Sequence, residues 1–378
     1  MDVQGHAAWG KIDMNVVFRA DASLQIGTGH IVRSLSLADK LRARGLTPHF
    51  VCRMHAGNMV AAIRQQGYGV TELPTIPAFS PLAAETCDFR LAHADWLGSD
   101  WKQDADETRS AIQDSKPDLL IVDHYAIDKR WEEQLRPHVR KLMVIDDLAD
   151  RRHECDFLLD QNWFGDDTLG RYRGMIPDHC ITMLGPEYAL LKPEYSMLRA
   201  QMPPRNGKAE RILVFMGGSD PTNETGKVLD ALAHPDLAHL HVDIVIGVNH
   251  PDPQSVTHQA AARPLTHVHS GLPSLAPLMM HADLMLSAGG STSWERMCLG
   301  LPAIVISIAD NQIVTNHAMH AAGYIHFLGE CNQISATIIA DSIIQCIQQP
   351  QQLQQMSQMG QDLVPGSGTQ RVCDILLD

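Results

Sequence analysis

Short apolar runs alternate with segments of helical periodicity along most of the chain. In the first half the apolar runs predict six strands, namely Asn15–Arg19, Pro48–Cys52, Gly69–Leu73, Leu119–Asp123, Leu142–Asp146 and Phe157–Leu159. The segments between them predict helices over residues 30–44, 57–66, 102–115 and 129–136. This alternation is typical of a parallel, doubly wound α/β domain. The proline-rich stretch Leu73–Ser99 is expected to be a loop or a partly helical insertion.

The same pattern starts again after a linker that contains proline and glycine, Gln201–Lys208. It predicts strands over Arg211–Gly217, Val242–Gly247, Leu284–Ser287 and Ala303–Ile306, and helices that begin near Pro253, Pro273, Ser291 and Asn311. We therefore expect two Rossmann-like doubly wound domains, residues 14–200 and 209–378, which face each other across a cleft. The glutamine-rich stretch Gln348–Gln361 is expected to form an exposed helix, because leucine and methionine recur in it.

Composition narrows the possible partners. The formal net charge of -14 argues against a general binder of nucleic acid or of anionic membranes. The first residues, Met1–Asp13, lack the apolar segment of a signal peptide, and we interpret them as a loose leader with Met14 as an alternative start. The eight cysteines are scattered without a Cys-x-x-Cys pair, which favours small core residues in a reducing cytoplasm over a disulfide framework or a zinc site.

The first candidate site follows the first predicted strand. Gly27 and Gly29 form a turn, and His30 then opens a helical pattern. A helix N-terminus beside a glycine turn can bind an anion, and His30 would add a base there. A strand–turn–helix connection without any ligand is an equally good interpretation of this stretch alone.

The second half repeats this arrangement. Gly289-Gly290-Ser291 follows a predicted strand and opens a helix, so that its backbone N–H groups can hold a diphosphate while Glu295 accepts hydrogen bonds from ribose. A simple capping motif is the alternative. Gly217-Gly218 and Asp310-Asn311-Gln312 also connect strands to helices, and three such openings on one sheet edge favour a nucleotide site.

The first half also places Asp123 and Asp146 at the carboxyl ends of strands, where they either face the cleft or brace loops.

The sequence argues against three other enzyme classes, namely Ser-triad hydrolases, P-loop NTPases and dinucleotide-dependent dehydrogenases. The chain has no Gly-x-Ser-x-Gly nucleophile elbow and no Walker lysine, and Val32 stands where a dinucleotide fingerprint needs glycine.

Taken together, the motifs resemble one family. They are Arg19-Ala-Asp21, Gly27-Thr-Gly29-His30-Ile-Val-Arg33, Asp123-His124-Tyr125, Asp146-Asp147, Cys155-Asp-Phe-Leu-Leu-Asp-Gln-Asn162, Leu184-Gly-Pro-Glu-Tyr188 and Gly217-Gly-Ser-Asp220. Their order is similar to that of the UDP-2,4-diacetamido-2,4,6-trideoxy-β-L-altropyranose hydrolases of pseudaminic acid biosynthesis, which are relatives of glycosyltransferases with the GT-B fold. The resemblance spans roughly Met14 to Ile375.

The resemblance implies a reaction in which water displaces UDP from the sugar with inversion at the anomeric carbon, without a cofactor or a metal ion. His30 would be the catalytic base, and Tyr125 and Asn311 would act with it at the sugar and the diphosphate. The implied substrate-binding residues are Gly29, Arg33, Gly217, Gly218, Leu272, Gly290, Ser291, Glu295 and Gln312.

Two alternatives stay open from the sequence. A GT-B glycosyltransferase would pass the sugar to an acceptor, although no concentrated apolar or basic patch for a lipid acceptor is found in the first half. A UDP-sugar-binding protein without turnover is the other. In either case we expect a cytoplasmic monomer whose partner is a small UDP-sugar, with no nucleic acid and no membrane.

Overall fold

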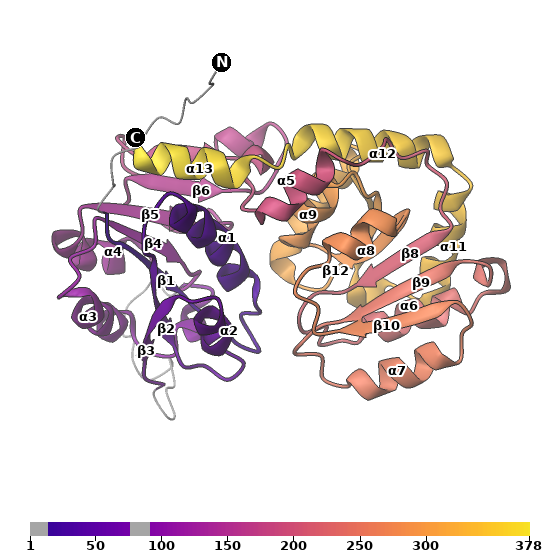
Figure 1. Ribbon diagram of the computed structural model, residues 1–378, viewed down its shortest axis with the longest axis horizontal. Coiled ribbons are helices and arrows are strands. Elements are labelled where there is room, and N and C mark those ends of the chain that lie inside the picture. Colours follow the sequence, from indigo (N-terminus) through magenta and orange to yellow (C-terminus); the bar gives the residue numbers. More distant parts are fainter. Residues whose placement is uncertain (1–13, 76–90) are drawn as a thin grey trace, which may run out of the picture.

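The computed structural model describes residues 14–75 and 91–378, and the predicted leader Met1–Asp13 lies outside these residues. The chain forms two units, each built on one parallel sheet (Figure 1). The first sheet has the order β3-β2-β1-β4-β5-β6-β7. Its strands are β1 (Val16–Ala20), β2 (His49–Arg53), β3 (Gly69–Leu73), β4 (Leu119–Asp123), β5 (Lys141–Ile145), β6 (Phe157–Asp160) and β7 (Ile181–Leu184).

The six strands predicted for this unit are confirmed to within one residue at each end, and β7 was not predicted. The central strands β1 and β4 are buried along their whole length, which explains their unbroken apolar sequence. The helices are α1 (Gly29–Ala43), α2 (Val60–Gln65), α3 (Trp101–Ile112) and α4 (Lys129–Leu135). The next helix, α5 (Pro193–Arg199), falls inside the predicted first domain, residues 14–200, but its Tyr195 is buried in a cluster of the second unit. Of the predicted insertion Leu73–Ser99, residues 76–90 lie outside the described residues, and Ala94–Leu97 form the 3-10 helix η2.

The second sheet has the order β10-β9-β8-β11-β12-β13. Its strands are β8 (Arg211–Phe215), β9 (His241–Ile246), β10 (Thr266–Ser270), β11 (Leu284–Ala288), β12 (Ala303–Ser307) and β13 (His326–Glu330). The prediction missed β10 and β13. The helices are α6 (Glu224–Leu232), α7 (Pro253–Ala261), α8 (Ala276–His281), α9 (Thr292–Cys298), α10 (Ile313–Ala321), α11 (Ala336–Ile347) and α12 (Pro350–Leu363). Within residues 14–75 and 91–378, no helix has both the length and the apolar character that crossing a membrane requires.

The glutamine-rich stretch is helical as predicted, but it is not simply exposed. Helix α12 buries Leu353 and Met356, and it packs closely on α9, where a Cβ at Gly360 would lie 3.3 Å from Met297 Cγ. The sequence signal was the recurrence of leucine and methionine, and the structure uses those residues as a buried stripe.

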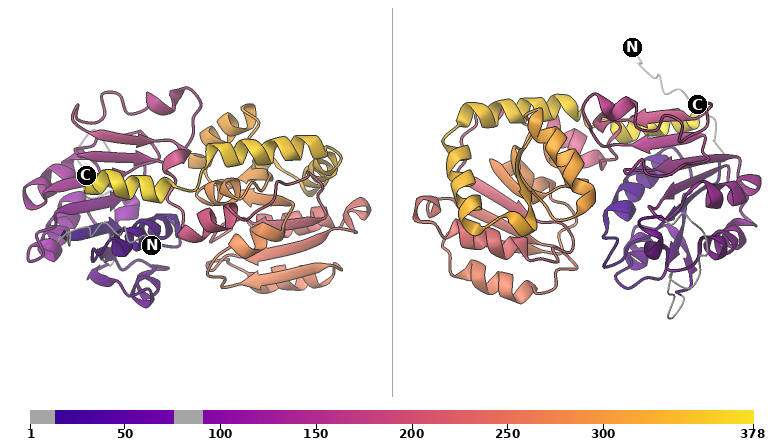
Figure 2. Two further views of the ribbon diagram at one scale, coloured as in Figure 1. Left: turned by 45° about the horizontal axis from the view of Figure 1, so that its top comes forward. Right: turned by 180° about the vertical axis from the view of Figure 1, so that it is seen from behind.

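The last helix, α13 (Gly368–Leu377), leaves the second unit and lies beside α1 and β6 of the first (Figures 1 and 2). Its Val372, Cys373 and Leu376 belong to the same buried cluster as Phe18 of β1. The predicted division of the chain put residues 209–378 in the second domain, whereas the side chains of α13 complete the core of the first.

The order in which the chain adds strands reverses between two neighbouring strands of each parallel sheet, β1 and β4 in the first unit and β8 and β11 in the second. Ligands of doubly wound sheets bind beyond the carboxyl ends of strands at such a point. The loops that leave these strands meet between the two units. A Cβ at Gly29 would lie 3.9 Å from Ser291 Oγ, and one at Gly218 would lie 3.2 Å from Thr28 Oγ1.

Candidate active site

His30 is the second residue of α1 and is 6% exposed. Its Nδ1 lies 2.5 Å from Oδ1 of Asp123, the last residue of β4. The β1–β4 register pairs Ala20 with Asp123, and this brings the carboxylate beside the start of α1. Because Asp123 engages Nδ1, the imidazole presents Nε2 on its opposite edge, and no hydrogen bond from the described part of the chain engages that atom.

Arg33, one helical turn after His30, binds the same carboxylate through two bonds. Its Nε lies 2.7 Å from Asp123 Oδ2 and its Nη2 lies 2.6 Å from Oδ1. Burial would raise the pKa of Asp123, but the positive charge of Arg33 and the hydrogen bonds that Asp123 makes with Arg33 and His30 hold that pKa well below its ordinary value. Asp123 is therefore a permanent carboxylate that can stabilise a positive charge on His30.

Arg33 also contacts a second carboxylate, with its Nη1 2.6 Å from Asp147 Oδ2. The guanidinium is buried and carries three bonds to carboxylates. These three bonds hold Asp123 and Asp147 in place, and the direct contact between Arg33 and substrate that the resemblance implies stays a prediction.

Tyr125 completes this group of side chains. Its hydroxyl donates a 2.5 Å hydrogen bond to Asp147 Oδ2, and its ring meets the ring of His30 edge-on, with centroids 4.5 Å apart. Burial and the charge of Asp147 raise the pKa of Tyr125 well above its ordinary value, so the phenol stays protonated. The geometry fits a residue that lines the site beside the base, and a part for Tyr125 in the chemical step stays a prediction.

The motif residues Arg19 and Asp21 form a buried ion-pair network that stabilises the first unit. Both are fully buried, and Arg19 Nη1 lies 2.7 Å from Asp21 Oδ1 and Nη2 lies 2.7 Å from Asp104 Oδ2 of α3. Asp21 also accepts a hydrogen bond from Arg53 N. These bonds tie the end of β1 to β2 and α3, and so they fix the strand from which the site loop begins.

The second unit presents Gly290 and Ser291 to this group. Gly290 has a φ of +106°, which favours glycine. The N-cap residues, Ser291 before α9 and Thr28 before α1, make no side-chain capping bond. Because Gly29 and Ser291 lie against each other, two uncapped helix starts meet between the units. Backbone donors and helix dipoles at such ends attract an anion.

The turn at Gly217 and Gly218 differs from the prediction in one respect. The helix that follows it, α6, is already capped, because Asp220 accepts hydrogen bonds from the N–H groups of residues 224 and 225 and Asn223 accepts one from residue 226. Asn223 is the N-cap residue of this helix. The start of α6 therefore offers few donors to a phosphate, and binding there would depend on the glycine backbone alone.

Glu295 of α9 is partly buried, and burial raises its pKa to about 7, although the Tyr195 hydroxyl and the charge of Lys192 act in the opposite direction. Lys192 also donates a 2.9 Å bond to the carbonyl of Pro273, the residue after the half-exposed Leu272. Glu295, the predicted ribose residue, and Leu272, the predicted neighbour of uracil, therefore both lie near Lys192. Both roles stay predictions.

Gln312 and Asn311 belong to the 3-10 helix η7 (Asp310–Gln312). Gln312 Oε1 accepts a 3.1 Å bond from Ile308 N, and its Cβ would lie 3.2 Å from a Cβ at Gly289. The predicted opening at Asp310–Gln312 therefore packs on the one at Gly289–Ser291. Asn311 is exposed, and no contact within the described residues joins it to His30, so its catalytic role stays a prediction.

The sequence reasoning missed the partner of His30 and two aromatic side chains. It placed Asp123 at a strand end but left bracing as an equal alternative. His93 and Trp96, at η2, fall in the stretch Leu73–Ser99 that was expected to be a loop or a partly helical insertion, and their ring centroids lie 5.6 Å and 5.8 Å from that of Tyr125. Nothing in the pattern of this short segment could have indicated them.

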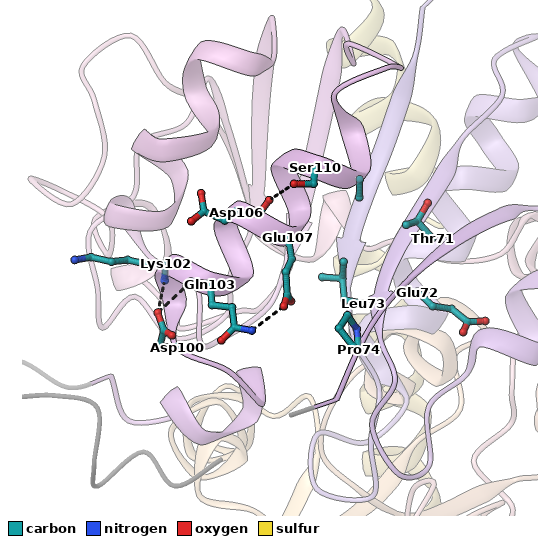
Figure 3. A pocket seen from close by; sticks show the side chains of 11 residues that line it. Thr71, Glu72, Leu73, Pro74, Asp100, Lys102, Gln103, Asp106, Glu107 and Ser110 are labelled. Carbon is teal, nitrogen blue, oxygen red and sulfur yellow. Dashed lines mark hydrogen bonds between the residues drawn. The ribbon is translucent and has the colours of Figure 1, made fainter. Parts of the chain in front are cut away.

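A hollow in the first unit lies away from these residues, between β3 and α3 (Figure 3). Its acidic side chains have structural partners. Asp100 accepts hydrogen bonds from the first N–H groups of α3, and Glu107 binds Arg53 and Gln103. The described residues contain no group of three His, Cys, Asp or Glu side chains arranged to hold a metal ion.

The fold defines the class of protein. Residues 212–364 match the family described as "Glycosyltransferase family 28 C-terminal domain". The whole chain is similar to MurG of Acinetobacter baumannii, with a TM-score of 0.65 and 14% identity over 96% of this chain and 99% of that one. It is equally similar to UGT89C1 of Arabidopsis thaliana complexed with UDP, with a TM-score of 0.65 and 12% identity over 96% and 98% of the two chains. The protein has the GT-B fold.

Sequence relatives lead to a particular family. The chain is 24% identical to the UDP-2,4-diacetamido-2,4,6-trideoxy-β-L-altropyranose hydrolase of Campylobacter jejuni over 82% of this chain and 98% of that protein. It is 23% identical to the spore coat polysaccharide biosynthesis protein SpsG of Bacillus subtilis over 97% and 98% of the two chains. An uncharacterized protein of Methanocaldococcus jannaschii is 22% identical over 78% of this chain, which spans about half, 55%, of that protein. The family resemblance drawn from the motifs is thus confirmed.

Proposed function

We propose that the protein hydrolyses a UDP-linked sugar to UDP and the free sugar, with inversion at the anomeric carbon. By analogy with the named relative, the substrate is UDP-2,4-diacetamido-2,4,6-trideoxy-β-L-altropyranose, and the reaction belongs to pseudaminic acid biosynthesis. The observation that carries the proposal is the pairing of His30 with Asp123 beside two uncapped helix starts.

In this reaction His30 Nε2 accepts a proton from water as the water oxygen bonds to the anomeric carbon. The bond between that carbon and the diphosphate oxygen breaks, and its electron pair leaves with UDP. Asp123 stabilises the imidazolium that forms, because its carboxylate already holds Nδ1. The starts of α1 and α9 stabilise the negative charge that grows on the leaving diphosphate.

A glycosyltransferase remains the second candidate, since the match of residues 212–364 and the GT-B neighbours favour that class. The two candidates differ in what attacks the sugar. A transferase needs an acceptor hydroxyl, whereas a hydrolase needs only a water molecule at His30.

The test is proton and phosphorus NMR of the purified protein with this UDP-sugar in ¹⁸O-water containing EDTA and no acceptor. We expect release of UDP without ¹⁸O, together with free sugar whose first-formed anomer is inverted. Label in UDP would mean cleavage of the P–O bond and would contradict the mechanism. An intact substrate would contradict hydrolysis and favour transfer or binding without turnover.

A further inference from the structure

The 3-10 helix η2 (Ala94–Leu97) is packed firmly on the first unit, within the stretch that the sequence predicted as a loop or a partly helical insertion. Leu97 is 1% exposed and belongs to a buried cluster with Val122 and Trp131. Gly98 follows with a φ of +69°, and a Cβ there would lie 2.6 Å from His55 Cε1. The backbone at the C-terminal end of η2 is therefore anchored, which restricts where its other side chains lie.

Those other side chains surround Tyr125. The Trp96 indole lies nearly parallel to the Tyr125 ring, at 27° and with centroids 5.8 Å apart, and the His93 ring lies 4.4 Å from that of Trp96. Tyr125 in turn touches His30 edge-on, and its hydroxyl is fixed by Asp147. We name His93, Trp96 and Tyr125 the aromatic wall.

The wall has one buried member and two that reach the surface. Tyr125 is 6% exposed, whereas His93 and Trp96 are only partly buried, which leaves part of their ring surface uncovered beside the candidate base. Burial lowers the pKa of His93, and the nearby charge of Asp150 does not offset this, so its ring is neutral at neutral pH. The uncovered surface is thus aromatic and uncharged.

We infer that the aromatic wall is the sugar-binding face of the site, and that Trp96 determines specificity by packing against the C–H face and apolar substituents of a pyranose. Ring faces carry a negative quadrupole, to which the weakly positive C–H groups of a sugar are attracted, whereas a diphosphate is not. The inference rests on the proposed function, because that function places the anomeric carbon next to His30.

The test separates the sugar from the nucleotide. Isothermal titration compares UDP with UDP-2,4-diacetamido-2,4,6-trideoxy-β-L-altropyranose, using His30→Ala as the parent so that the sugar nucleotide stays intact. Adding Trp96→Ala is expected to weaken binding of the sugar nucleotide about tenfold, or ~1.4 kcal/mol, and to leave the UDP affinity unchanged. Trp96→Phe should restore most of the loss, because it keeps an aromatic face.

Trp101→Ala is the matched control, since Trp101 begins α3 and contacts Lys102 and Arg130 instead of the wall. Equal losses for UDP and the sugar nucleotide, or no loss for either, would overturn the inference. Turnover by the wild-type protein is measured in parallel. If the wild-type protein hydrolyses the substrate and Trp96→Ala keeps the same KM, the sugar-binding role of the aromatic wall is contradicted and the hydrolase function is not. If Trp96→Ala selectively loses affinity for the sugar nucleotide but the wild-type protein shows no turnover, the aromatic wall is supported and the hydrolase function is refuted.

Discussion

The pairing of His30 with Asp123 decides what a single side chain can do at this site. Asp123 holds the imidazole through Nδ1 and is itself held by Arg33, so within the described residues the Nε2 edge of His30 is left for a water molecule. This arrangement suits the base of the proposed reaction, and it does not by itself bind the nucleotide.

Replacing His30 by alanine should therefore lower turnover by about two to four orders of magnitude, the usual contribution of an acid–base group, and should leave the UDP affinity nearly unchanged. Steady-state kinetics and titration with UDP check the two parts. His258→Ala serves as the control, because His258 is exposed on α7. Wild-type turnover in His30→Ala would exclude this residue as the base.

Glu295 gives a pH-dependent prediction, since its pKa is raised from 4.5 to about 7 by burial. Ribose hydroxyls donate more strongly to a carboxylate than to a carboxylic acid, so the affinity for uridine should rise about fivefold, or ~1 kcal/mol, as the pH rises through 7. Uridine is used because it has no phosphate that titrates in this range. Glu295→Gln should bind weakly with a flat pH profile, and a wild-type profile that is equally flat would reject the ribose role.

The same group affects the stability of the unliganded protein in the opposite sense. A carboxyl whose pKa is higher in the folded state binds more protons there than in the unfolded chain, so its contribution to folding is full below about pH 4.5 and is lost as the pH rises to 7. Relative to Glu295→Gln, the wild-type free energy of unfolding should fall across this range.

At the scale of elements, the sequence predicted every strand that has neighbours on both sides, and one edge strand, β3. The three strands that it missed, β7, β10 and β13, all lie at sheet edges. Edge strands bury less of their surface, and their sequences show it: Thr266–Ser270 contains two histidines and no residue of β10 is buried. Without an apolar run, a period-based prediction has no signal to detect.

The site was predictable where it depends on strand order alone. Parallel strands bring their carboxyl ends to one edge of each sheet, and the two predicted domains face each other across a cleft, so the sequence could place His30 and Gly290 on the loops that line it. The bond between His30 and Asp123 spans 93 positions, and it depends on the β1–β4 register, which the pattern does not encode. The aromatic wall depends on η2, which is too short to leave a periodic signal.

The backbone of the turn between β8 and α6, which contains Gly217 and Gly218, can be tested by a substitution at a neighbouring glycine. A Cβ at Gly247, which follows β9, would lie 2.3 Å from the carbonyl oxygen of Gly217 and 2.4 Å from that of Gly218. Gly247→Ala should therefore displace this turn, destabilise the protein by about 1–3 kcal/mol and weaken UDP binding.

Gly170→Ala is the matched control for this change. Gly170 also has a negative φ, and a Cβ there would meet its nearest atom at 3.8 Å, an ordinary contact. Its stability should change by less than about 1 kcal/mol. If both variants kept the wild-type melting temperature and UDP affinity, the turn would not be constrained in the way that the structure indicates.

At the scale of the whole molecule, two consecutive helices belong to different units. Leu353 of α12 is buried in the second unit with Ile343, whereas Leu376 of α13 is buried in the first with Phe18. The start of α13 is fixed to the segment before α5, where Thr369 Oγ1 donates a 2.7 Å bond to the carbonyl of Leu191. The two units are thus linked by two crossings of the chain.

This arrangement predicts opposite local effects for two similar substitutions. Leu376→Ala should destabilise the first unit by about 2–4 kcal/mol, and Leu353→Ala should destabilise the second by a similar amount, because each leaves a cavity in its own core. Hydrogen exchange resolves the difference, through faster exchange in β1 and β2 for the first variant and in β8 and β9 for the second. The reverse pattern, or equal effects in both sheets, would contradict the placement of α13.

The return of α13 also bears on how the protein is made. A chain leaves the ribosome from its N-terminus, and domains in most proteins fold in that order. Here the side chains that complete the first core are translated after the entire second unit, so the nascent first unit exposes an apolar face beside α1 until then. During synthesis, the unit that is begun first is the one that is finished last.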